Sequence, residues 1–109
     1  MDQYIATAMS RILTLTDIKE MAHEDVQSVR DFCDAFSKRV AVRYLQDDLS
    51  WEQGDAVMNH LFNLMISHSG NRVPDFAWEV YLAFDAGEYM EPGGDATTRP
   101  LINKLQGDA

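Results

Sequence analysis

Apolar residues recur at helical spacing along almost the whole chain. Near the N-terminus an i, i+3, i+4, i+7 pattern predicts a helix over residues 2–15. A clearer pattern, with apolar residues on one side and Asp and Arg on the other, predicts an amphipathic helix over residues 24–45. Between them, Asp17 and Glu20 have the spacing of a capping box, which indicates a short turn of helix.

A third helix is expected after the polar segment QDDLS. Ser50 and Gln53 have the spacing of a capping box, so the helix should begin beside them and cover residues 51–68. Gly70 stands where a helix commonly ends.

The last third of the chain predicts two more helices. Pro74 suits the first position of a helix over residues 74–86, and Gly87 is its expected stop. Thr98 is expected to cap a short final helix over residues 99–106.

The segment FAWEVYLAF, residues 76–84, is rich in aromatic and β-branched residues and could instead form a strand. We favour a helix because Pro74 and Gly87 bracket a segment of helical length. The sequence therefore predicts an all-α protein, with residues 1–109 forming a single-domain antiparallel bundle of four to five helices.

Composition narrows the class of protein and the compartment. The 109 residues are 46% hydrophobic, which is typical of one globular domain and not of a disordered chain. Neither a signal-peptide pattern nor an apolar stretch of membrane-spanning length is present. The single cysteine, Cys33, excludes an intramolecular disulfide. We expect a cytoplasmic protein that does not bind membranes.

Charge is distributed unevenly along the chain, whose net charge is −9. Residues 44–98 contain ten acidic residues and only one basic residue, Arg72, whereas residues 1–43 are nearly balanced. Phosphate binding depends on clustered Lys and Arg, so nucleic acid is a poor partner. A basic protein is the partner that this charge favours.

The sequence does not indicate an enzyme, a metal site or a cofactor. His60 and His68 are eight residues apart, which places them about 12 Å from each other on one helix and prevents both from binding one ion. Carboxylate pairs at helical spacing occur, but no cleft or sugar platform accompanies them. Cys33 lies on an apolar stripe, where a thiol is typically inert. Nucleotide-binding and nucleophile-elbow motifs are missing.

A recognition surface is the remaining interpretation. We expect acids and a tyrosine of the C-terminal third to form one acidic partner-binding face, with support from acids earlier in the chain and from other aromatic residues. The predicted partner-binding residues are Asp75, Glu79, Asp85, Glu88, Tyr89, Glu91 and Asp95. The supporting acids are Asp47, Asp48, Glu52 and Asp55, and the accompanying side chains are Tyr44, Trp51 and Met90.

Four segments of the chain together resemble the small helical immunity proteins of bacterial toxin systems, in particular the colicin D immunity-like group. They are HEDVQSVRDFCDAFSKRV, AVMNHLFNLM, VYLAFDAGEYMEPGGD and TTRPLINKLQ. The resemblance covers residues 20–106 and includes a D-x-x-x-Y turn from Asp85 to Tyr89. It implies a cytoplasmic inhibitor that binds a cognate toxin domain, often a basic nuclease, and blocks its active site with acidic side chains.

Two alternatives from other classes stay open. A nucleic-acid-mimic inhibitor encoded by a phage, of the anti-restriction or anti-CRISPR type, would share the acidic surface. A non-catalytic scaffold protein would instead self-associate through exposed apolar residues. The predicted oligomeric state is a monomer or a weak homo-oligomer.

Overall fold

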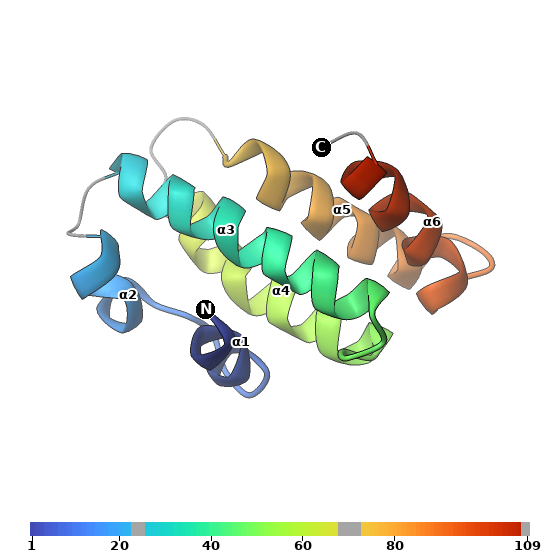
Figure 1. The fold of residues 1–109 in the computed structure, drawn as a ribbon, viewed down its shortest axis with the longest axis horizontal. Coiled ribbons are helices and arrows are strands. Elements are labelled where there is room, and N and C mark those ends of the chain that lie inside the picture. Colours follow the sequence, from blue (N-terminus) through green and yellow to red (C-terminus); the bar gives the residue numbers. More distant parts are fainter. Residues whose placement is uncertain (23–25, 68–72, 108–109) are drawn as a thin grey trace.

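The computed structural model describes residues 1–22, 26–67 and 73–107, and this part of the chain consists of helices joined by turns (Figure 1). The predicted all-α class is confirmed, and residues 76–84 are helical rather than extended. The described part contains six helices, slightly more than the predicted four to five. They are α1 (Asp2–Ala8), α2 (Leu15–Ala22), α3 (Val26–Leu45), α4 (Trp51–Ser67), α5 (Asp75–Tyr89) and α6 (Gly94–Gly107).

The three long helices α3, α4 and α5 lie alongside one another, and each reverses the direction of the one before it (Figure 1). Helix α6 folds back mainly against α5, while α1 and α2 cover the other side of α3 and α4. The molecule measures 40 × 26 × 23 Å along its principal axes. The arrangement is therefore a bundle of four helices with two short N-terminal helices packed against it.

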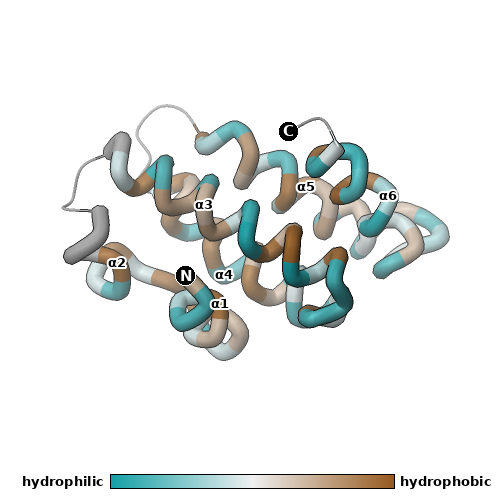
Figure 2. Tube along the Cα trace, viewed as in Figure 1, coloured by the Kyte–Doolittle hydropathy of each residue, from teal (hydrophilic) through white to brown (hydrophobic). Residues whose placement is uncertain are grey.

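Buried side chains from all six helices form one hydrophobic cluster. Hydrophobic and hydrophilic positions alternate along the helices, as amphipathic packing requires, and the turn between α3 and α4 is hydrophilic (Figure 2). Tyr44, Phe36 and Phe84 are the largest fully buried side chains. The rings of Tyr44 and Phe84 meet edge to face, with their centroids 5.0 Å apart.

The predicted helix over residues 2–15 is wrong in length, because α1 ends at Ala8. The chain turns there and docks on α4. The Nδ1 atom of His60 donates a hydrogen bond to the carbonyl of Ala8, and the backbone N–H of Leu13 donates to the carbonyl of His60 over 3.1 Å. His60 is therefore a docking residue, and this contact was not visible in the local sequence pattern.

Helix α2 is capped differently from the prediction, which paired Asp17 with Glu20. Thr14 precedes the helix, and its backbone N–H donates to Asp17 Oδ2 over 2.8 Å. Arg11 holds the same carboxylate with two hydrogen bonds of 2.7 and 2.9 Å. These bonds, with that of Arg11 the strongest, lower the pKa of Asp17.

The start of α4 is as predicted, with both hydrogen bonds of a capping box. The backbone N–H of Gln53 donates to Ser50 Oγ over 3.1 Å, and that of Ser50 donates to Gln53 Oε1 over 2.9 Å. Gly70, the expected stop of this helix, and Glu24, the expected start of α3, lie outside the described residues.

The expected break at Gly87 is wrong, because α5 continues through it to Tyr89. A Cβ atom at position 87 would lie 2.5 Å from Thr98 Oγ1 and 2.7 Å from Trp51 Nε1, so the glycine lets α4 and α6 approach α5 closely. Thr98 is likewise not a cap, since it is buried within α6. Its hydroxyl accepts from Trp51 Nε1 and donates to the Ala83 carbonyl, both over 2.8 Å.

The first turn of α5 is capped by a residue distant in sequence. Pro74 precedes the helix in an extended conformation, one position earlier than predicted, and supplies no side-chain cap. The carboxylate of Asp34 on α3 accepts instead from the backbone N–H of Ala77 over 2.9 Å. This bond fixes the N-terminal end of α5 against α3.

Candidate functional site: an acidic and aromatic face on α4 and α5

Three aromatic side chains stack along the surface where α4 and α5 meet. The rings of Phe62 on α4 and Tyr81 on α5 have centroids 4.8 Å apart, and Trp78 stacks on Tyr81 at 5.4 Å. All three are half-buried, so each covers the core with one side and leaves part of the ring accessible. Such rings supply a large contact area with little loss of conformational entropy on binding.

Carboxylates gather at one end of this aromatic stack. Asp55 lies two turns before Phe62 on α4, and it is hydrogen-bonded to Glu88 of α5 with Asp85 close by. Partial burial, followed by the negative charges of Glu88 and Asp85, raises the pKa of Asp55 to about 7. The same two acids reinforce the effect of burial in raising the pKa of Tyr81.

Tyr89 completes the surface at the C-terminal end of α5, where it is 79% exposed. We call this surface the α4–α5 face. Its members are Asp55, Phe62, Trp78, Tyr81, Asp85, Glu88 and Tyr89.

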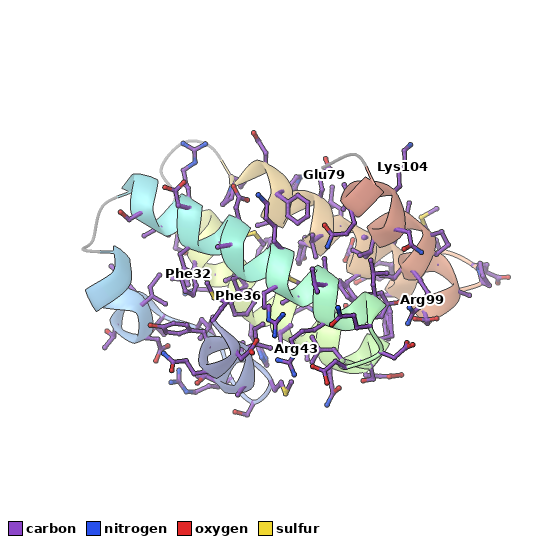
Figure 3. The ribbon with its side chains drawn as sticks, in the orientation of Figure 1. Phe32, Phe36, Arg43, Glu79, Arg99 and Lys104 are labelled. Carbon is purple, nitrogen blue, oxygen red and sulfur yellow. The ribbon has the colours of Figure 1, made fainter. Side chains whose placement is uncertain are left out.

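Arginine side chains neutralise several acids elsewhere but none of the three on the α4–α5 face, within the part of the chain that the structure describes. Arg43 pairs with Asp48 over 2.8 Å, and Arg99 pairs with Asp47 over 2.7 Å. Both arginines lie near the turn between α3 and α4 (Figure 3). The α4–α5 face therefore carries negative charge that no arginine of the described residues neutralises.

The structure divides the seven predicted partner-binding residues among several places. Asp85, Glu88 and Tyr89 lie together on the α4–α5 face. Glu79 precedes Glu88 by nine residues, or about 180° around the helix, and lines a groove beside α6 instead. Asp75 is exposed at the start of α5.

The last two predicted residues lie beyond α5. Glu91 is exposed in the turn before α6. Asp95 is exposed but already has partners on the protein, because it accepts a hydrogen bond from the Tyr44 hydroxyl and pairs with Arg99 over 3.1 Å. Burial and this hydrogen bond raise the pKa of Tyr44. A single face containing all seven residues is therefore not what the bundle forms.

Sequence reasoning also misjudged some neighbours of the face. Tyr44 was expected at the surface but is fully buried. Asp55, expected only as a supporting acid, lies at the centre of the acidic end, and Phe62, Trp78 and Tyr81 were not among the predicted partner-binding residues. The spacing of Asp55 and Phe62 on α4, seven residues or two turns, was the available signal that they share one side.

The candidates for metal and thiol chemistry are His60, His68 and Cys33. Among the described side chains, no three of His, Cys, Asp or Glu are grouped to hold a metal ion, and His68 lies outside the described residues. Burial raises the pKa of the Cys33 thiol to about 12, which keeps it protonated and unreactive. None of the described helices is both long and apolar enough to cross a membrane.

The fold and the face together define a helical bundle with a charged and aromatic surface. No family model, curated protein or solved structure matches the chain. The resemblance to colicin D immunity-like proteins accordingly stays a prediction.

The acidic end of the face should make stability depend on pH. The pKa of Asp55 is about 7 in the folded chain against 3.8 for a free side chain, so between these values the folded state holds a proton that the unfolded state has lost. Stability from this group therefore falls as pH rises from 4 to 7. We expect Asp55→Asn to raise the free energy of unfolding at pH 8 by about 1 kcal/mol, because solvent screens much of the repulsion, and to have no effect near pH 3.

Urea unfolding at the two pH values measures this difference. Glu52→Gln is the matched control, because Glu52 is an exposed acid on the same helix. A variant Asp55→Asn that is less stable than the wild type at pH 8 would contradict the arrangement.

Proposed function

We propose that the protein is a cytoplasmic immunity protein, which binds a basic toxin domain through the α4–α5 face and thereby inhibits it. The observation that carries the proposal is the placement of three carboxyl groups, none of them paired with an arginine among the described residues, beside three stacked, half-buried aromatic rings. Aromatic residues commonly anchor protein interfaces, and surrounding charges select the partner and accelerate its approach. A nuclease is the toxin class that the surface favours, because carboxylates can occupy the positions of substrate phosphates.

Electrostatics supports a rapid encounter with such a partner. The chain carries a net charge of −9, and opposite charges can raise association rates by one to three orders of magnitude at low salt. An inhibitor that must act before a toxin damages the cell benefits from this rate. The face also receives the partner on the side walls of two long helices, whose positions are set by the core, so little rearrangement is required.

Charge reversal tests the proposal directly. The double variant Asp85→Lys/Glu88→Lys should lose at least about 100-fold in affinity for the partner, because two attractive contacts become repulsive. The partner is first captured from a lysate of the source cell at low salt with the wild-type protein as bait. Binding of the purified partner and inhibition of its activity are then measured for wild type and variant.

The matched control is Glu79→Lys/Glu91→Lys, which makes the same change in net charge at two exposed acids outside the α4–α5 face. It should retain most of the affinity. If the two double variants lose affinity for the partner to the same extent, the proposed face is wrong and only the total charge of the protein matters. If the captured partner keeps its full activity when bound, the proposed inhibition is wrong.

A further inference from the structure

An apolar groove lies between α5 and α6, away from the α4–α5 face. It has a volume of about 340 Å³ and is walled by Leu82 and Ala83 of α5 and by Leu101 and Leu105 of α6. Leu82 is 38% exposed and Leu101 is 41% exposed, so the two leucines leave apolar surface accessible on neighbouring helices. An apolar surface that stays accessible in this way is typical of an interaction site.

One acid and one base border the groove. Glu79 stands on α5 and Lys104 on α6, and both side chains project from the same edge of the molecule (Figure 3). Both are exposed, and neither forms an ion pair among the described residues. The groove therefore has balanced charge, in a chain whose net charge is −9.

This balance indicates what fits the groove. Two copies of so acidic a chain repel each other across most of their surfaces, and the α4–α5 face, with three carboxylates, is unsuited to pairing with itself. A basic partner is equally unsuited to the groove, because Lys104 would oppose it. Across a twofold axis, in contrast, Glu79 of one copy can meet Lys104 of the other, and the reverse pair forms by symmetry.

We infer that a second copy of this chain docks at the α5–α6 groove, forming a weak twofold dimer in which leucines pack at the centre and Glu79 and Lys104 pair across the interface. The contact is small, so a dissociation constant on the order of 100 µM is expected. The inference does not rest on the proposed function, since it uses the opposite side of α5. Dimerisation through this groove leaves the α4–α5 face of each copy accessible.

Sedimentation equilibrium with a charge-swapped pair of variants tests the dimer. The average mass of the wild type should rise from 12.4 kDa toward twice that value between about 10 µM and about 1 mM protein. Glu79→Lys and Lys104→Glu should each remain monomeric, because each places like charges opposite each other. An equimolar mixture of the two should associate again, because both pairs then join opposite charges, one in the original arrangement and one with the charges exchanged.

Glu52→Lys is the matched control. It changes the net charge by the same amount as Glu79→Lys, but at an exposed position of α4, and should leave the dimer intact. Recovery in the mixture also shows that both single variants are folded. A wild type that stays monomeric at the highest concentration overturns the inference and leaves the groove to an amphipathic helix of another protein. Dimers that persist in both single variants overturn it as well.

Discussion

Replacing Phe84 by alanine is expected to lower the free energy of unfolding by about 4 kcal/mol. Phe84 lies at the centre of the bundle, 1% exposed, where its ring meets Tyr44 of α3 and approaches Gly54 of α4. Removing it leaves a cavity between three long helices that hold one another in place, so the site cannot collapse to fill it. Urea unfolding followed by circular dichroism measures the loss.

A double-mutant cycle with Gly54 makes this prediction specific. A Cβ atom at position 54 would lie 2.5 Å from two atoms of the Phe84 ring, so Gly54→Ala alone should destabilise by about 2 kcal/mol. In the Phe84→Ala background the clash is removed, and the same change should be neutral or stabilising because alanine favours the helix. Additive effects would show that the two residues are not in contact. Leu82→Ala, at a partly exposed position of the same helix, should cost much less.

The second large effect is expected at Gly87, where alanine should destabilise the fold by about 3 kcal/mol. The added methyl group would press on Thr98 Oγ1, on Trp51 Nε1 and on the Gly94 carbonyl, which lies 3.0 Å from the Cβ position. Relief by movement would lengthen the hydrogen bonds that Thr98 makes to Trp51 and Ala83. Buried polar groups that lose their partners add to the cost.

Gly107→Ala provides the control for this substitution. Gly107 is also helical, but an added Cβ there meets nothing within 4 Å. Its replacement should therefore be neutral or slightly stabilising. Tryptophan fluorescence and thermal unfolding report on both variants, and equal stability of the two would refute the close packing of α4, α5 and α6 around Gly87.

Local sequence signals predicted those features that depend on neighbours in the chain. The capping box of Ser50 and Gln53 placed the start of α4 correctly, because both its hydrogen bonds connect residues three apart. The length of the segment between Pro74 and Gly87 also identified α5 correctly as a helix, although the helix continues past Gly87 to Tyr89. In both cases the residues that give the signal lie within a few helical turns of one another.

The predictions for Gly87 and Thr98 failed because contacts between helices determine the role of each residue. Gly87 and Thr98 have the form of a stop and a cap, and the same residues serve instead as a contact point and a buried hydrogen-bond centre. The end of α1 at Ala8 likewise depends on His60, which is distant in sequence. The spacing of residues along the chain does not reveal such contacts between distant residues.

At the candidate site, too, the sequence predicted some features and helix packing decided the others. The sequence by itself determined that the chain forms helices and that its excess negative charge falls in residues 44–98, because both are properties of composition and period. Only the tertiary structure decided which acids lie together. Asp55 joins Asp85 and Glu88 because α4 packs against α5. Glu79 faces the opposite side of α5, and Asp95 is bound by the Tyr44 hydroxyl. Helix packing sets these neighbours, since rotation of a helix about its axis by half a turn exchanges its inner and outer residues.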